Sequence, residues 1–269
     1  MCAMSISDAT PAFGPALRRG PWVLREAAGA ADMSQLLALR ARVFRGDAGA
    51  SDADAQDPHC RHLWIGRPEG PPLATLRLRH HPNPASLRTG YCAGYFDMGP
   101  LGRAPGTALE LGRLCLAPEA AQVELMRLVW TGIARMVAQA GAARMIGCTS
   151  LPGDDPAAHR PVLARLARRH LGPATLRPRP GPVAAISLSD LRMQHRDAQE
   201  ARLPPILRSY VALGGWVSDV VAIDRDLGTC LVFTCVEVAS MPDDRRRLLH
   251  KLAGLEASGA RADRWSASA

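Results

Sequence analysis

The sequence is poor in aromatic residues and has almost no lysine. Aromatic side chains make up 4% of its 269 residues, so alanine and leucine must fill most of the core that a 47% apolar content allows. Lys251 is the only lysine, so nearly every cation is a planar guanidinium that can bind a carboxylate through two hydrogen bonds. The length fits one large domain, which we place at residues 21–240. A flexible tail is expected over residues 1–20, and a C-terminal helix with a partly disordered tail over residues 241–269.

Several chemical signatures are missing. The seven cysteines include no Cys-x-x-Cys pair, so free thiols in a reducing compartment are expected. The segment His59-Cys60-Arg61-His62 lacks the distant second pair of ligands that a metal site needs. Neither a Walker loop nor a Gly-x-Gly-x-x-Gly loop occurs, which argues against nucleotide-phosphate binding. No signal-peptide pattern or membrane-spanning run is present, so we expect a cytoplasmic protein.

A net charge of +8 favours an anionic partner such as nucleic acid, anionic lipid or an acidic carrier protein. Nucleic acid is not expected, because the sequence has no helix-turn-helix pattern, no finger spacing and no basic patch interleaved with aromatics. A merely solvated basic surface is the alternative. Peripheral contact with the anionic inner face of a membrane is left open.

Apolar periodicity and turn residues predict an α/β fold. Strands are predicted over residues 22–26, 62–65, 73–79, 109–116, 143–149, 183–188, 217–223 and 229–236. Helices are predicted over residues 35–44, with Asp32 or Ser34 as N-cap, and over 121–139, 161–170, 190–202 and 203–214. The strand, helix and strand between residues 109 and 149 form a βαβ-type crossover. Residues 80–106 are predicted to be irregular, and the Asp-rich loop at 45–60 has the composition of a solvated turn cluster.

The most informative segment is Ala108-Leu-Glu-Leu-Gly-Arg-Leu-Cys-Leu-Ala-Pro118. It predicts a strand that carries Glu110 and Arg113 inside an apolar run, where a charge is costly unless it is paired or functional. Simple alternation places Arg113 on the face opposite Glu110, but Gly112 indicates a bulge, which would change that facing. A structural Glu–Arg pair and a catalytic site both explain the pattern.

A second unusual segment, Gly147-Cys-Thr-Ser-Leu-Pro-Gly153, lies at the end of a predicted strand. It is not the Gly-x-Ser-x-Gly elbow of serine hydrolases, and only His159 is available to assist Ser150 as a nucleophile. A turn that holds a ligand through Cys148 and Ser150 is the preferred interpretation.

The order of these motifs resembles the ornithine N-acyltransferases of ornithine-lipid biosynthesis. They belong to the Gcn5-related acyltransferase superfamily and are similar to the acyl-homoserine-lactone synthases. The resemblance spans residues 22–236 and rests on Leu39-Arg-Ala-Arg-Val-Phe44, Asp52-x-Asp-x-x-Asp57, His62-Leu63, Thr75-Leu-Arg-Leu78, Leu109-Glu-Leu-Gly-Arg113, Leu128-Val-Trp-x-Gly-Ile133, Gly147–Gly153 and Leu203–Trp216.

The resemblance implies a mixed sheet flanked by helices, with an acyl thioester in a splayed gap beside the central strand. It implies transfer of a 3-hydroxyacyl chain from acyl carrier protein to the α-amino group of L-ornithine, which gives lyso-ornithine lipid without a metal or a bound cofactor. The superfamily's pyrophosphate-binding loop is degenerate at Ala117–Gln122, which fits a phosphopantetheine thioester on a carrier protein better than coenzyme A. Motif matching places six residues in the family's charged cluster: Arg42, Asp54, Asp57, Arg77, Glu110 and Arg113.

The implied chemistry suggests roles for these residues. An amine attacks a thioester only after losing a proton, and we assign Glu110 as general base because burial raises the pKa of a carboxyl toward neutrality. Main-chain N–H groups freed at a bulge beside Arg113 would stabilise the oxyanion. Asp54 and Asp57 suit the side-chain amine of ornithine.

The carboxylate of ornithine is suited to Arg42, Arg77 or Arg113, although all these charges could simply anchor loops. Two other functions stay open: a signal synthase of the acyl-homoserine-lactone type, and a non-catalytic module that binds an acyl carrier or lipid. The arginines between residues 160 and 179 offer a surface for an acidic carrier or form a solvated helix face. Acyl length, oligomeric state and the choice among ornithine, glutamine, lysine and glycine do not follow from the sequence.

Overall fold

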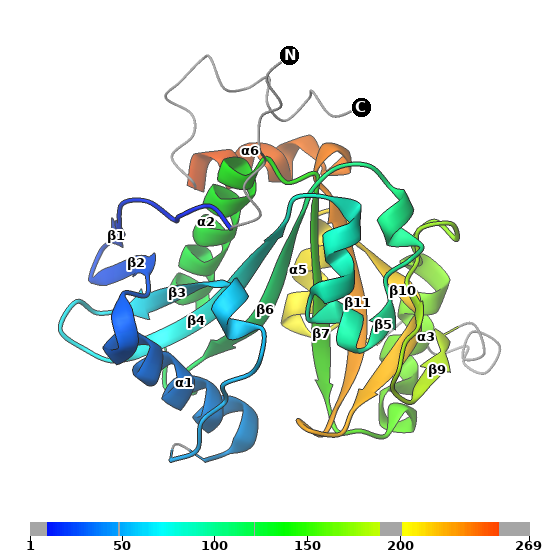
Figure 1. The fold of residues 1–269 in the computed structure, drawn as a ribbon, viewed down its shortest axis with the longest axis horizontal. Coiled ribbons are helices and arrows are strands. Elements are labelled where there is room, and N and C mark those ends of the chain that lie inside the picture. Colours follow the sequence, from blue (N-terminus) through cyan, green and yellow to red (C-terminus); the bar gives the residue numbers. More distant parts are fainter. Residues whose placement is uncertain (1–9, 48, 121, 189–200, 253–269) are drawn as a thin grey trace.

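The computed structural model describes residues 10–47, 49–120, 122–188 and 201–252. Within these residues a nine-stranded sheet has the order β1-β2-β3-β4-β6-β7-β11-β10-β9 (Figure 1). Neighbouring strands of this sheet pair antiparallel, except β6 and β7, which are parallel. The predicted mixed sheet with flanking helices is confirmed.

The elements have the following bounds. The sheet contains β1 (Leu17–Arg19), β2 (Trp22–Glu26), β3 (Arg61–Gly66), β4 (Pro72–His81), β6 (Ala108–Leu116), β7 (Arg144–Pro152), β9 (Ala185–Ser187), β10 (Trp216–Asp224) and β11 (Thr229–Glu237). The helices are α1 (Gly29–Arg45), α2 (Gln122–Ala140), α3 (Arg160–Arg169), α5 (Pro205–Ala212) and α6 (Asp243–Leu252). A separate pair joins β5 (Phe96–Asp97) to β8 (Arg179–Pro180). Short 3₁₀ turns lie at Asp57–His59, Pro84–Thr89, Cys92–Gly94, Leu101–Arg103, Pro156–His159 and Val238–Ser240.

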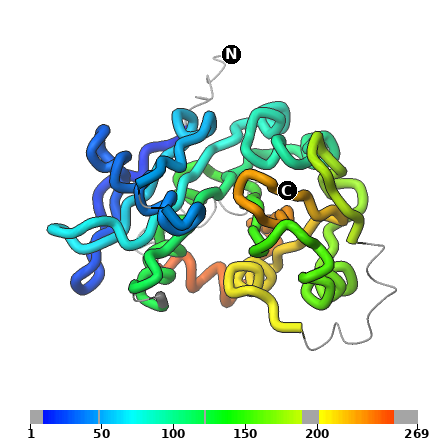
Figure 2. The backbone as a smooth tube through the Cα atoms, turned by 90° about the horizontal axis from the view of Figure 1, so that it is seen from below, coloured from blue at the N-terminus to red at the C-terminus, as the bar shows by residue number. Residues whose placement is uncertain are grey.

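Helix α2 covers one face of the N-terminal half of the sheet. Its apolar side buries Val129, Ile133 and Val137 against strand residues that include Leu109, and Gly141 ends it in the left-handed region at φ +56°. Helix α1 lies on the opposite face, where Leu39 contacts Cys115. In the C-terminal half, α3 and α5 pack against β7, β10 and β11. In Figure 2 the blue and cyan N-terminal segments lie on one side and the yellow and orange C-terminal segments on the other, with green segments between them.

Two predictions near the N-terminus are wrong. Residues 10–20 are not a loose tail, because Phe13 is fully buried in the α2 core and Leu17–Arg19 pairs with β2. Helix α1 begins at Gly29 and not beside Asp32 or Ser34. Asp32 lies in its first turn, where its carboxylate accepts a hydrogen bond from the Ala28 N–H at 2.6 Å. Residues 1–9 and 253–269, and most of the predicted helix over 190–202, lie outside the described residues.

Strands β6 and β7 pair over only part of their length. Ala108–Leu111 pairs with Arg144–Gly147, and the two strands then diverge while β7 continues to pair with β11 (Figure 1). Glycine at position 147 permits the last contact, because a Cβ there would lie 2.7 Å from the Leu111 carbonyl oxygen. The β7-facing edge of β6 is therefore free of strand pairing from Gly112 onward.

A bulge in β6 changes which side chains face the same way. Gly112 pairs with Arg77 and Cys115 with Thr75, so two residues of β6 oppose one residue of β4. Arg113 lies in the left-handed region at φ +50°, a conformation that costs an arginine on the order of 1–3 kcal/mol. The bulge indicated by Gly112 is confirmed, and it brings Arg113 to the face that carries Glu110.

Candidate active site

Three arginines and three aspartates form a buried charged network beside the bulge. Arg40 from α1 binds Asp52 at 2.9 Å and Asp57 at 2.8 Å. Arg77 from β4 and Arg113 from β6 complete it through Arg77–Asp54 (2.5 Å), Arg77–Asp57 (2.7 Å), Arg113–Asp52 (2.8 Å) and Arg113–Asp54 (3.1 Å). The Asp-rich loop is therefore not a solvated cluster. It is the acidic half of the charged network.

Burial makes this network costly to disrupt. The side chains of Arg40 and Asp52 are 1% and 0% exposed, so removal of either would take one ion pair from a charge that stays in a poorly solvated site. Burial alone would raise the pKa of Asp57, but hydrogen bonds from Arg40 and from the Asp54 N–H outweigh it and lower that pKa to about 2.

Arg40 takes the place that motif matching gave to Arg42. The Arg42 side chain is 41% exposed and binds Glu119 at 3.1 Å, outside the charged network. The assignment of Arg42 is thus wrong. The useful signal was Arg40 itself, which interrupts the apolar stripe of its helix and is nevertheless buried.

Glu110 does not have the properties predicted for a general base. Its carboxylate accepts hydrogen bonds from the backbone N–H groups of Cys92 at 2.7 Å and Tyr91 at 3.1 Å, and it lies 3.1 Å from His81 Nε2. Burial alone would raise its pKa, but His81 and Cys92 outweigh burial and lower the pKa to about 2. Glu110 lines neither cleft described below. It anchors the turn that begins at Gly90, where a Cβ would lie 2.5 Å from its Oε2.

The first cleft, which we call the splay cleft, opens where β6 and β7 diverge. Its volume is about 520 Å³. Apolar side chains from β6, α2 and α5 line much of it: Leu111, Leu114, Leu116, Met126, Trp130 and Ile206. Cys148 and Ser150 from β7 also line it. The Cys148 sulfur lies 3.4 Å from that of buried Cys92.

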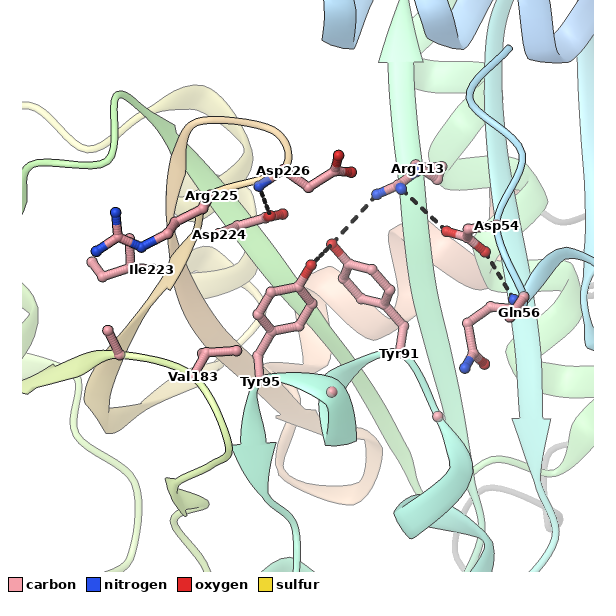
Figure 3. Close-up of a pocket in the computed structure, with 14 residues that line it drawn as sticks. Asp54, Gln56, Tyr91, Tyr95, Arg113, Val183, Ile223, Asp224, Arg225 and Asp226 are labelled. Atoms are coloured by element: carbon pink, nitrogen blue, oxygen red, sulfur yellow. Dashed lines mark hydrogen bonds and ion pairs between the residues drawn. The ribbon is translucent and has the colours of Figure 1, made fainter.

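The second cleft, which we call the tyrosine cleft, is about 620 Å³ and has charged walls. The hydroxyls of Tyr91 and Tyr95 lie 3.4 Å apart, and Arg113 Nη1 lies 3.4 Å from the Tyr91 hydroxyl (Figure 3). Asp54, Asp224, Arg225 and Asp226 complete its charged lining. Tyr91 and Arg113 line both clefts. The two tyrosines were missed because they lie in the segment predicted to be irregular.

Comparison with known proteins identifies the class of this chain. Residues 39–131 match the acetyltransferase (GNAT) domain family. An L-ornithine N(alpha)-acyltransferase from Rhodobacter capsulatus is 29% identical over 201 residues, which cover 72% of this chain and 78% of that protein. An L-ornithine N(alpha)-acyltransferase from Rhizobium meliloti is 29% identical over 239 residues, covering 81% of this chain and 80% of that one. The chain is an acyltransferase with a GNAT domain.

Among solved structures, an N-acyl amino acid synthase from uncultured soil microbes aligns with this acyltransferase at a TM-score of 0.47 and 7% identity. The alignment covers 81% of this chain and 92% of the synthase.

The acyltransferase brings together most residues named from its sequence. Arg113 and Asp54 line the tyrosine cleft, and Arg113, Cys148 and Ser150 line the splay cleft. Asp57 and Arg77 lie behind them in the charged network. No helix that the structure describes in residues 10–252 is long and apolar enough to cross a membrane.

Acid should unfold the acyltransferase steeply. The pKa values of Asp57 and Glu110 fall to about 2 in the folded chain, below their ordinary values of 3.8 and 4.5. Both groups therefore stabilise the fold above their ordinary pKa values, and this contribution is lost as the pH falls through the folded values. Between about pH 4 and pH 2, we expect the free energy of unfolding to fall with a slope approaching about 2.7 kcal/mol per pH unit.

Urea unfolding across this pH range measures that slope. Asp57→Asn should roughly halve it, whereas Glu69→Gln, which alters an exposed carboxyl, should leave it unchanged. A free energy of unfolding that stays constant from pH 5 to pH 2 would contradict the assignment of these two carboxylates.

Proposed function

We propose that this acyltransferase moves a 3-hydroxyacyl chain from the phosphopantetheine thioester of acyl carrier protein to the α-amino group of L-ornithine, forming lyso-ornithine lipid. Two relatives whose alignments with this chain cover 78% and 80% of their own length are named L-ornithine N(alpha)-acyltransferases. One structural observation carries the proposal: an apolar-lined cleft and a charged cleft share Tyr91 and Arg113. A fatty chain and a zwitterionic acceptor need such a pair of neighbouring sites.

The splay cleft suits the acyl chain and its thioester. Its apolar wall would bury the methylene groups, which favours binding by about 0.8 kcal/mol per methylene. Beyond Leu111 the β6 main chain has no strand partner on the β7 side. Its N–H groups are therefore placed to donate to the thioester carbonyl and to the oxyanion that develops there.

The tyrosine cleft suits the amino acid. Asp54 offers a carboxylate in the tyrosine cleft, and Arg113 offers a guanidinium at the wall shared with the splay cleft, which matches the α-ammonium and α-carboxylate of an amino acid. Burial alone would raise the pKa of Asp54, but hydrogen bonds from Arg77 lower it. Asp54 would therefore orient the amine as an ionised acceptor, and the proton would leave through water in the cleft.

The donor and the product suggest contacts with acidic partners. Arg160, Arg168 and Arg169 on α3 are exposed, and they would attract an acidic carrier protein or an anionic membrane surface. Because carrier and membrane would both respond to salt, the identity of the donor needs a direct assay.

The test uses purified protein, 3-hydroxyacyl carrier protein and L-ornithine, with mass spectrometry of the product. We expect N-α-(3-hydroxyacyl)ornithine, and much slower transfer from the matching coenzyme A thioester. Ser150→Trp should abolish transfer because the indole fills the splay cleft, whereas Val123→Trp, on the exposed side of α2, should not. Preferred acylation of glutamine or glycine, or a lactone formed from S-adenosylmethionine, would refute the proposal.

A further inference from the structure

Asp224 places an unpartnered carboxylate oxygen in the tyrosine cleft. The residue ends β10, is 2% exposed and lines the cleft. Its Oδ1 accepts hydrogen bonds from the N–H groups of Asp226 at 3.0 Å and Leu227 at 3.3 Å. Its Oδ2 is buried and has no hydrogen-bond partner among the described residues. Such an orphan oxygen is rare in folded proteins because its lost hydration is not replaced.

The cations around the cleft are already engaged elsewhere. Arg113 binds Asp52 and Asp54, and Arg45 binds Asp226 at 2.8 Å. Figure 3 shows the Arg225 guanidinium directed away from the Asp224 carboxylate. Asp224 itself forms no ion pair within the described part of the chain. The cleft therefore presents one negative charge without a counter-ion.

Tyr95, which interacts with Asp224, cannot supply that counter-ion. Burial is the main cause that raises the pKa of Tyr95 to about 12; the hydrogen bond with Tyr91 lowers this pKa by less than burial raises it, and the interaction with Asp224 adds to the rise. Tyr95 therefore stays protonated and neutral at physiological pH. A neutral hydroxyl beside a buried carboxylate leaves the negative charge of that carboxylate uncompensated.

Asp54 and Asp224 lie on opposite sides of the tyrosine pair (Figure 3). An acceptor that contacts Asp54 and Arg113 through its α-amino and α-carboxyl groups would extend its side chain past Tyr91 and Tyr95. We propose that Asp224 Oδ2 binds the side-chain ammonium of the acceptor, so that the tyrosine cleft selects cationic over neutral amino acids. This inference rests on the proposed function and adds the residue that recognises the terminal ammonium of the acceptor amino acid.

The test compares L-ornithine with L-norvaline, which has the same carbon chain without the terminal amine. Asp224→Asn keeps an acceptor oxygen for the turn but removes the charge. We expect wild-type kcat/KM to favour ornithine by about 100-fold, and this preference to fall below about 5-fold in Asp224→Asn, mainly through KM. Asp155→Asn, which alters an exposed aspartate that accepts the Ala157 N–H in the loop after β7, should keep the wild-type preference.

A second variant tests the length of the site. Asp224→Glu keeps the charge but extends it by one methylene, and we expect its preference to move from ornithine to 2,4-diaminobutyrate, which is one methylene shorter. Unchanged preference for ornithine in both variants would overturn the assignment of Asp224. A wild-type protein that acylates no cationic amino acid would instead refute the proposed function.

A binding measurement on the wild-type protein covers the case in which neither variant folds. Ornithine should raise the thermal midpoint and norvaline should not, since only a ligand that binds the folded state stabilises it. Equal shifts for the two amino acids would overturn the proposal.

Discussion

Substitution of Glu110 by alanine is expected to lower the free energy of unfolding by about 3–5 kcal/mol. The carboxylate is 5% exposed and is the acceptor for the N–H groups of Tyr91 and Cys92, so its loss leaves these two donors and His81 Nε2 without this partner. The fall of its pKa from 4.5 to about 2 gives a similar magnitude, about 3 kcal/mol at neutral pH. Urea unfolding at pH 7 measures the loss.

Activity would fall in the same variant because the turn that carries Tyr91 loses its anchor. Glu69→Ala, at an exposed glutamate, is the stability control and should unfold like the wild-type protein. The pH profile separates a structural role from a catalytic one, since a group with a pKa of about 2 cannot produce a rate limb near neutrality. A normally stable Glu110→Ala protein that has lost only turnover would restore Glu110 as the base.

Replacement of Arg113 by lysine is expected to lower kcat/KM by about 100- to 1000-fold. The guanidinium binds Asp52 and Asp54 with different nitrogens and lies over the Tyr91 ring at 5.3 Å. Lysine keeps the charge but lacks the planar fork, so it cannot hold both carboxylates and the tyrosine together. The assay is transfer of the acyl group to ornithine.

Arg42→Lys is the matched control for this prediction. It makes the same chemical change at an exposed arginine of the neighbouring helix, where the partner is Glu119, and should leave kcat/KM within about 2-fold of wild type. Equal activity of the Arg113→Lys and wild-type proteins would show that acyl transfer does not require the guanidinium of Arg113.

Much of the fold could be predicted because its signals are local. The hairpin of β3 and β4, the β6–α2–β7 crossover and the pairing of β10 with β11 follow from apolar periodicity and turn residues. The start of α1 was missed because Gly29–Asp32 carries no apolar stripe that separates it from a loop.

The site was harder to predict because its properties come from distant contacts. Burial alone predicted a raised pKa for Glu110, but its carboxylate accepts hydrogen bonds from N–H groups 18 and 19 residues earlier in the chain, which favour the ionised form. Tyr91 and Tyr95 carried no periodic signal, and their position is fixed by packing of the following segment, where Phe96 contacts Phe233 of β11. Of these features, only the bulge could be predicted from a nearby residue, the mid-strand Gly112.

The bulge reverses which positions of β6, even-numbered or odd-numbered, face a given side of the sheet. Up to Gly112 the even-numbered positions, Glu110 and Gly112, face the side of the sheet that carries the charged network. From Arg113 onward the odd-numbered positions, Arg113 and Cys115, face that side. If the strand were straightened without loss of a residue, plain alternation would turn the Arg113 guanidinium into the leucine layer beneath α2. The one extra residue therefore decides inside and outside for the remainder of the strand, and does not merely add to its length.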